Sequence, residues 1–207
     1  MTRGVVRQEL DRATDVPPEQ AHLRAAMAGD PVATARLLET LARRLSGVVR
    51  AVMGKEHPDS EDAFQEAMIA LVQALPTFRG ECDFAGFAIV IAVRTALAAR
   101  KRAGKDQLRL DNETDMSSLP SDRPSPPDEA MQERRKDLVR QLLSQIPFEQ
   151  AESLALRFIL GWSLKEIASH TGAPLNTVRS RLRLAKEALR RRIASDSAVL
   201  RVLEVEA

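Results

Sequence analysis

The chain has 207 residues, of which 44% are hydrophobic, so it is long enough to bury one large core or two small ones. Basic and acidic residues nearly balance, 31 against 29, and the net charge is only +2. Cys82 is the single cysteine, which excludes an intramolecular disulfide framework and a zinc site built from cysteines alone. No apolar run approaches the roughly 18 residues of a membrane span and no signal-peptide core is present, which predicts a cytoplasmic protein without membrane insertion.

Helix signals recur through the first half of the chain. Asp30 is a predicted N-cap with Pro31 at the first helical position, and Gly54 marks the end of that helix. The next helix is expected to begin at Ser60, where acidic residues favour the positive end of the helix dipole, and to stop before Pro76. The helices predicted in this half run over residues 18–28, 31–53, 60–75 and 84–103.

The hydrophobic periodicity vanishes between Lys105 and Asp128, where prolines lie among serines and aspartates. This composition is typical of an extended or disordered linker. Helices are expected again over residues 128–146 and 149–160, and no alternation of strand type occurs. We therefore expect an all-α fold of two small helical domains joined by a flexible Pro-rich linker. The expected boundaries are 17–104 for the first domain, 105–127 for the linker, 128–194 for the second domain and 195–207 for a C-terminal tail.

The second domain ends with a short capped helix, a glycine turn and a strongly basic helix. Ser163 and Glu166 form a predicted capping box at the start of the first of these helices, and Gly172 ends it. Asn176 or Thr177 is expected to cap the basic helix. The predicted inward positions of the basic helix are Val178, Leu182, Ala185 and Leu189. Its remaining positions carry the basic residues Arg179, Arg181, Arg183, Lys186, Arg190, Arg191 and Arg192 against the single acid Glu187.

A basic helix by itself is often only a solvated surface. Here a short helix and a glycine turn come directly before it, and this combination is typical of a helix-turn-helix, whose second helix enters the major groove of DNA. A cationic face of this density also repels itself unless a polyanion lies against it. We therefore expect the basic helix to bind DNA.

Three segments, in this order and spacing, resemble the extracytoplasmic-function (ECF) group of the sigma-70 family of bacterial RNA polymerase sigma factors. The family's region 2 helix is similar to SEDAFQEAMIALVQALPTF, and its DNA-melting segment to FRGECDFAGFAIVIAVRTALAARKR. Its region 4 is similar to LLSQIPFEQAESLALRFILGWSLKEIASHTGAPLNTVRSRLRLAKEALRR. The resemblance implies promoter-specific initiation with three partners, namely core RNA polymerase, promoter DNA and an anti-sigma protein, and it implies no cofactor.

The resemblance also assigns an interface to each segment. The outward patch of the 60–75 helix would dock on the clamp helices of the largest polymerase subunit through charge-assisted hydrogen bonds. The loop from Arg79 to Asp83 would hold a base flipped out of the minus-ten element, and the basic helix after it would contact phosphates. The implied residues are Asp62, Gln65 and Glu66 for core polymerase; Phe78, Arg79, Gly80, Glu81, Cys82, Asp83, Arg94, Arg100, Lys101 and Arg102 for minus-ten DNA; and Asn176, Thr177, Arg179, Ser180, Arg183 and Lys186 for minus-thirty-five DNA.

The helix after that loop departs from the family pattern at three positions. Phe87, Arg94 and Ala98 stand where relatives usually have tryptophan, asparagine and aspartate. The changes add positive charge, which points to an unusual minus-ten specificity. Of the nearby aromatic residues, Phe84 and Phe87 are expected mainly to pack in the core.

Other protein classes share some of these features. A one-component helix-turn-helix regulator would need no polymerase, and a sigma mimic that only sequesters an anti-sigma protein would need no basic recognition helix. An enzyme is disfavoured, because His22, His57 and His170 make no Glu-x-x-His pair and the sequence has neither a P-loop nor a nucleophile elbow. For Cys82, a bystander thiol is favoured over a redox sensor.

Overall fold

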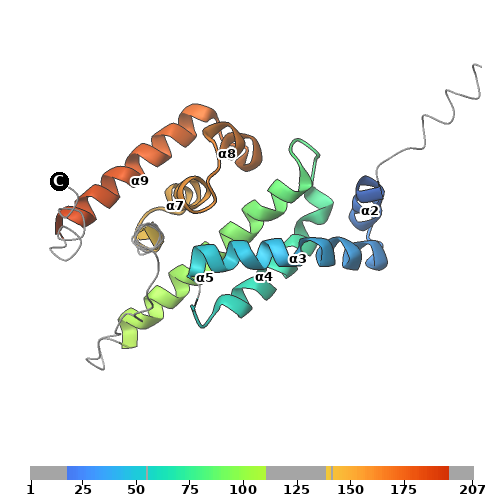
Figure 1. Ribbon diagram of the computed structural model, residues 1–207, viewed down its shortest axis with the longest axis horizontal. Helices are drawn as coiled ribbons and strands as arrows, with labels where there is room; N and C mark the ends of the chain where they lie inside the picture. Colours follow the sequence, from blue (N-terminus) through green and yellow to red (C-terminus); the bar gives the residue numbers. More distant parts are fainter. Residues whose placement is uncertain (1–17, 55, 111–138, 141, 196–207) are drawn as a thin grey trace, which may run out of the picture.

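The computed structural model describes residues 18–54, 56–110, 139–140 and 142–195. All the regular structure in these ranges is helical, which confirms the all-α prediction (Figure 1). Most of the predicted linker, most of the predicted 128–146 helix and the C-terminal tail lie outside the described residues. The helices are α2 (Pro18–Met27), α3 (Pro31–Met53), α4 (Ser60–Ala74), α5 (Phe84–Leu110), α7 (Phe148–Leu154), α8 (Leu164–Thr171) and α9 (Leu175–Ser195), with a 3-10 turn at Leu75–Thr77 and a π-helical turn at Ala155–Ile159.

The start and the end of α3 follow its sequence signals. Asp30 Oδ1 accepts hydrogen bonds from the backbone N–H groups of Val32 at 2.8 Å and Ala33 at 3.0 Å, so the predicted N-cap is confirmed. Gly54 follows the helix with φ of 108°, a conformation that a side chain would disfavour. Both ends of α3 are therefore set by local chemistry.

The long helix α5 begins as expected and ends later than expected. Asp83 Oδ1 accepts a hydrogen bond from the backbone N–H of Gly86 at 2.7 Å, which caps the first turn. The helix then continues to Leu110, beyond the predicted linker boundary at Lys105. The sequence from Lys105 to Leu110 holds no glycine or proline, so nothing in it stops a helix that has already been nucleated.

The helix-turn-helix forms at α8 and α9. The Ser163 side chain accepts a hydrogen bond from the Glu166 N–H at 3.2 Å while the Glu166 carboxylate accepts one from the Ser163 N–H at 2.7 Å, so the capping box is confirmed. Gly172 ends α8 with φ of 71°, in the left-handed region. The predicted cap of α9 is wrong: the helix begins before Asn176 and Thr177, directly after a proline whose fixed φ suits a helix start.

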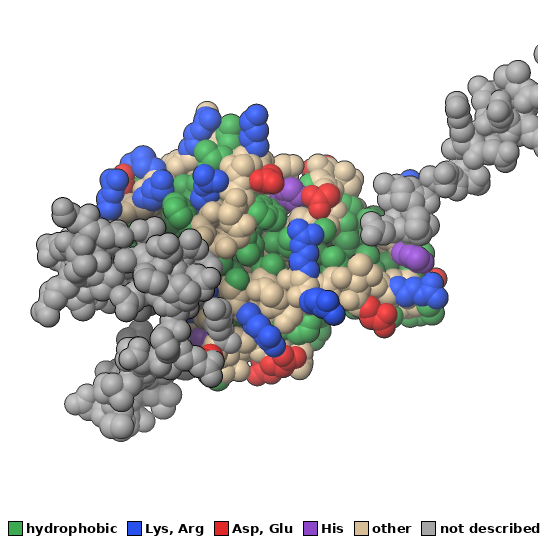
Figure 2. Space-filling model, viewed as in Figure 1, with side chains coloured by type: hydrophobic (Ala, Val, Ile, Leu, Met, Phe, Trp, Pro, Cys, Tyr) green, Lys and Arg blue, Asp and Glu red, His purple; other side chains and the backbone are tan. Residues whose placement is uncertain are grey.

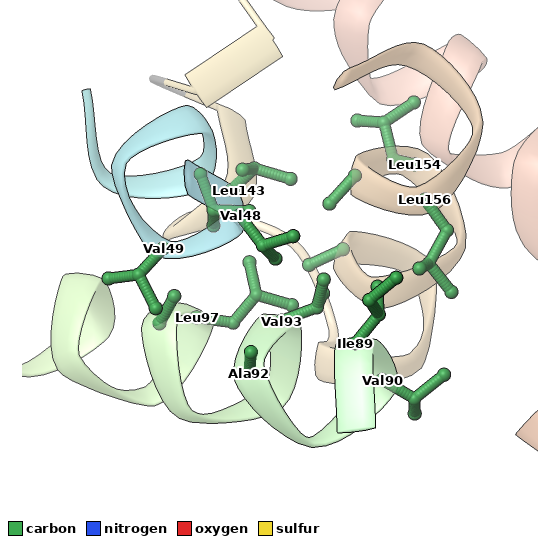
Figure 3. Packing of buried hydrophobic residues seen from close by; sticks show 14 of the residues in the cluster. Val48, Val49, Ile89, Val90, Ala92, Val93, Leu97, Leu143, Leu154 and Leu156 are labelled. Carbon is green, nitrogen blue, oxygen red and sulfur yellow. The ribbon is translucent and has the colours of Figure 1, made fainter. Parts of the chain in front are cut away.

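Buried side chains form one core cluster that runs through both halves of the molecule. In Figure 3, Val48 of α3, Val93 of α5 and Leu143 of the second half point into one shared space. Leu156 lies over Ile89 on the same side of α5. The helix α5 contacts α3 and α4 of the first half as well as α7 and α8 of the second. The two halves are thus packed on one another along α5 (Figure 1).

Candidate nucleic-acid interface

The DNA-binding residues proposed on α9 lie on its outer face. Val178 and Ala185 are fully buried and Leu182 is 6% exposed, so this stripe holds the helix on the core. The opposite face is cationic, and Figure 2 shows the basic side chains gathered along α9. Asn176, Arg179, Ser180, Arg183 and Lys186 are exposed there, and Thr177 is half-buried.

Local contacts orient some of these cations. The Arg179 guanidinium donates a hydrogen bond to the Asn176 amide oxygen at 2.9 Å. Arg183 pairs with Glu187 one turn later, at 2.6 Å, so part of its charge is neutralised within the helix. Lys186 lies 5.5 Å from the ring centroid of Phe158, which is 44% exposed. Phe158 lies in the π-helical turn and was not predicted as part of the site.

A shallow groove is lined by Arg157 of the π-helical turn, by the start of α8 and by α9. Leu164 and Leu182 give it an apolar floor, and most of its rim is basic. The basic side chains that line it are Arg157, Arg179, Arg183, Lys186 and Arg190. A groove of this charge is suited to a polyanion.

The loop before α5 stands on a cluster of aromatic rings. The ring centroids of Phe78, Phe84 and Phe87 are between 5.0 and 6.0 Å apart, so these side chains mainly pack on one another. Arg79 and Gly80 project from this base and are exposed. Rigid aromatic packing beneath an exposed loop holds its backbone in place.

The side chains of the same loop differ in their surroundings. Cys82 is half-buried, and burial, together with the negative charges of Asp83 and Glu81, raises the pKa of its thiol. A thiol with a raised pKa is a poor nucleophile at neutral pH, which favours the bystander role expected for Cys82. Glu81 is exposed and lies 4.0 Å from Arg79.

Asp83 connects the loop to the helix-turn-helix. Its Oδ2 atom accepts a hydrogen bond from His170 Nε2 at 2.5 Å, and His170 Nδ1 lies 2.8 Å from the carbonyl oxygen of Glu166. Both ring nitrogens of His170 therefore face acceptors, an arrangement that suits the doubly protonated imidazolium. The hydrogen bond from His170, then that from the Gly86 N–H, lowers the pKa of Asp83. Burial alone would lower the pKa of His170, but its bonds to Asp83 and Glu166 outweigh burial and raise it.

Three of the four basic residues proposed on α5 have hydrogen-bond partners within the protein. Arg94 Nε donates to Glu152 Oε1 at 2.6 Å, and the Glu152 side chain is only 3% exposed. Arg102 makes two hydrogen bonds with the Glu66 carboxylate, at 2.6 and 2.8 Å. Lys101 is exposed, and no ion pair or hydrogen bond involves it in the part of the chain that the structure describes. Two of the four cations expected on α5, Arg94 and Arg102, are thus paired with carboxylates in this conformation.

The outward face of α4 is more mixed than the sequence suggested. Asp62 and Gln65 are exposed, while Glu66 is partly covered by its contact with Arg102. Ile69 and Val72 lie on the same face, with exposures of 58% and 40%. Both were missed because they fall outside the apolar stripe that marks the buried side, although two exposed aliphatic residues beside a polar patch are a usable sign of a contact surface.

Comparison with known proteins identifies the family. Two family models match the chain, sigma-70 region 2 over residues 37–106 and sigma-70 region 4 over residues 136–189. The ECF RNA polymerase sigma-E factor of Haemophilus influenzae is 26% identical over 181 residues, which cover 84% of this chain and 95% of that protein. The sigma-E factor of Escherichia coli K12 is 31% identical over 138 residues, which cover 63% of this chain and 72% of that protein. The chain belongs to the ECF group of the sigma-70 family.

A solved structure of CnrH in complex with the cytosolic domain of CnrY superposes with a TM-score of 0.48 at 19% identity, over 86% of this chain and 99% of that one.

As an ECF sigma factor, the protein is an RNA polymerase initiation factor. The region 2 match takes in α4 and most of α3 and α5, and the region 4 match takes in α7, α8 and most of α9.

No helix in the described ranges has the length and apolar character needed to cross a bilayer. Likewise, within those ranges no three His, Cys, Asp or Glu side chains are grouped so as to hold a metal ion.

Proposed function

We propose that this sigma factor reads the minus-thirty-five element with the outer face of α9. The observation that carries the proposal is the exposure of Arg179 and Arg183 on the second helix of a helix-turn-helix whose buried stripe faces away from them. Arginine recognises guanine through two parallel hydrogen bonds in the major groove. Asn176, Thr177 and Ser180 at the start of the helix and Lys186 beyond it complete the proposed contact.

Region 2 is proposed to open the minus-ten element. The Arg79 to Asp83 loop would hold the flipped base above the aromatic cluster, which includes Phe78, and extrusion of that base costs a few kcal/mol that the pocket must offset. Phosphates of the upstream duplex would be contacted by α5. Its candidate residues are Arg94, Arg100, Lys101 and Arg102.

The outward face of α4 is proposed to dock on core polymerase. Asp62 and Gln65 would supply polar contacts and Ile69 and Val72 apolar ones further along the same face. Glu66 would join them once its pairing with Arg102 is released. An interface of this composition fits a basic, amphipathic helical partner.

The sigma factor would act in the cytoplasm, where core polymerase and promoter DNA are found, without a cofactor and without a catalytic group of its own. An anti-sigma protein is proposed as the partner that keeps it inactive, as is usual for the ECF group.

The test is transcription in vitro with purified core enzyme, followed by mapping of the start sites. We expect discrete start sites that require both core enzyme and this protein. A protein that binds duplex DNA but directs no core-dependent initiation would support the one-component regulator instead.

A further inference from the structure

Region 4 covers a part of region 2 that the proposed function assigns to promoter DNA. His170 of α8 contacts the Asp83 carboxylate at the N-terminal end of α5. Further along α5, the Arg94 side chain donates to the buried carboxylate of Glu152. Asp83 and Arg94 are both proposed minus-ten contacts, and in this conformation both are occupied by side chains of the second half.

A third group of contacts joins the two halves at the C-terminal end of α3. Arg140, which is only 5% exposed, donates from Nε to the carbonyl oxygen of Ala51 at 2.8 Å, in the last turn of α3. Arg100 of α5 donates to the carbonyl oxygen of Arg140 at 2.7 Å and to that of Met53 at 2.7 Å. Guanidinium groups at the C-terminal end of a helix satisfy its free carbonyl groups and complement its dipole.

Gly86 makes the close approach of His170 possible. A Cβ atom at this position would lie 2.0 Å from His170 Cδ2 and 2.1 Å from Nε2, closer than real side chains approach. The backbone of Gly86 has no positive φ, so a glycine is not needed there for the helix itself. The first turn of α5 is therefore shaped to receive a ring from region 4.

Apolar packing lies between the polar contacts. Ile89 and Val93 of α5 are 3% and 0% exposed, and Leu154 and Leu156 of the second half are both 0% exposed. All four belong to the core cluster that the two halves share. Separation of the halves would expose this surface to water, which opposes opening.

The closed arrangement does not fit a promoter. The minus-ten and minus-thirty-five elements are separated by about 85 Å of B-form duplex, at 3.4 Å per base pair. Asn176, at the start of the recognition helix, follows His170 by six residues. Since His170 contacts Asp83, the two DNA-reading sites lie at most about 30 Å apart, even if those residues were fully extended. The chain between Leu110 and Val139 is long enough to let them separate, because at full extension it would reach about 100 Å.

We propose that the closed arrangement is the resting form of the free protein, in which region 4 masks the minus-ten surface of region 2 through the His170–Asp83 and Arg94–Glu152 contacts. It must open before both promoter elements are read. The mask rests on the proposed function, because it is an inhibitory contact only if Asp83 and Arg94 act on DNA. The outer face of α9 stays free in the closed form, so binding of minus-thirty-five duplex is not affected.

A distance measurement between the two halves tests the closed form directly. The distance between the halves would be measured by electron–electron double resonance, with spin labels on Ala35→Cys in α3 and Ser169→Cys in α8 in a Cys82→Ser background. Both label positions are exposed. We expect a single narrow distribution of short distances in the free protein. A broad distribution that extends to long distances would overturn the proposal.

Gly86→Ala and Gly86→Leu should shift the distribution toward longer distances, the larger side chain more strongly, because rotation of the His170 ring can make room for a methyl group but not for an isobutyl group. Gly47→Ala and Gly47→Leu in α3 are the matched controls, since a Cβ atom there meets no atom within 4 Å. The double variant Gly86→Ala, His170→Ala should return toward the parent distance. A Gly86→Leu protein that keeps the parent distribution would refute the assigned contact.

The masking of DNA is measured separately. Once start sites are mapped, the free Gly86→Leu protein should bind a single-stranded minus-ten oligonucleotide more tightly than the parent does, by the factor by which the open fraction rises. Its affinity for minus-thirty-five duplex should stay within twofold of the parent's. Equal minus-ten affinity in both proteins would overturn the mask. Failure of the parent to initiate transcription with core enzyme would instead overturn the proposed function and leave the distance result intact.

Discussion

The side chain of Arg179 is oriented by a neighbouring residue before it contacts DNA. Its guanidinium is exposed on α9 and already bonded to the amide oxygen of Asn176, so fewer of its rotamers must be lost when it meets a base. Arg183 on the next turn shares its charge with Glu187. Of the two arginines, Arg179 is therefore the better candidate for a base contact, and Arg183 for a phosphate.

Arg179→Ala should relax minus-thirty-five recognition, because a bidentate arginine contact discriminates between bases by about 1–3 kcal/mol. The check is transcription in vitro from the mapped promoter and from a version with an altered minus-thirty-five element. The ratio of the two signals should fall by roughly fivefold or more relative to the parent protein. An unchanged ratio would remove Arg179 from the base-reading set.

The contact between His170 and Asp83 should depend on pH. The pKa of His170 is raised above its ordinary value of 6.5, so its contribution is complete below pH 6.5 and is lost as the pH rises through the raised value. The pKa of Asp83 is lowered below 3.8, so its contribution is complete above that pH and is lost only in stronger acid. The charged groups that face the pair are Glu166 beside His170 and Arg44 beside Asp83.

A proton NMR titration of the His170 ring checks this dependence. In Asp83→Asn the pKa of His170 should fall relative to the parent, because the largest raising contribution is removed while burial remains. His22 in the same spectrum serves as the internal control. An identical His170 titration in both proteins would show that the contact does not form in solution.

At the scale of single elements, α8 depends on its capping box. The helix has only eight residues, so few hydrogen bonds offset the cost of nucleating it. Ser163→Ala removes one acceptor for the free N–H groups of the first turn and should destabilise the protein by about 1 kcal/mol. Thermal unfolding followed by circular dichroism measures the loss, with the exposed Ser169→Ala in the same helix as control. Equal midpoints for the two variants would contradict the assigned role of the cap.

The outward face of α4 offers a matched pair of truncations. Ile69→Ala and Val32→Ala each shorten an aliphatic side chain that is about 60% exposed, at 58% and 60%, so both should leave stability within about 0.5 kcal/mol. Only Ile69 lies on the proposed docking face. Affinity for core polymerase should fall by roughly fivefold or more in Ile69→Ala and stay unchanged in Val32→Ala, since truncation of a central contact costs more than about 1 kcal/mol. Equal affinities would place the docking face elsewhere.

Sequence reasoning predicted several helix ends from residues close together in the chain, although the expected cap of α9 was wrong. The cap at Asp30, the capping box at Ser163 and the turn at Gly172 each involve residues within a few positions of one another, and all three were predicted. It failed where the cause lies far along the chain. The partner of Arg94 is 58 residues away, and that of Asp83 is 87 residues away, so neither contact had a local signal.

Across the whole molecule, the departure of Arg94 from the family pattern acquires a structural role. A buried carboxylate is strongly disfavoured without a cationic partner, and Arg94 is the partner of Glu152 in the closed form. The net stabilisation from such a pair is small. A docking of region 4 that buried the carboxylate without its cationic partner would be strongly destabilised, so the pair selects one docking over others. The added charge on α5 thus serves the contact between the halves as well as any contact with phosphates.

In this proposal, the two halves of the sigma factor must separate before the chain can read both promoter elements. The most direct test places the labelled protein, with spin labels at positions 35 and 169, in a transcribing complex with core polymerase and the mapped promoter. We expect a short distance in the free protein and a much longer one in the promoter complex, because the two elements are about 85 Å apart. A transcribing complex that retains the short distance of the free protein would contradict it.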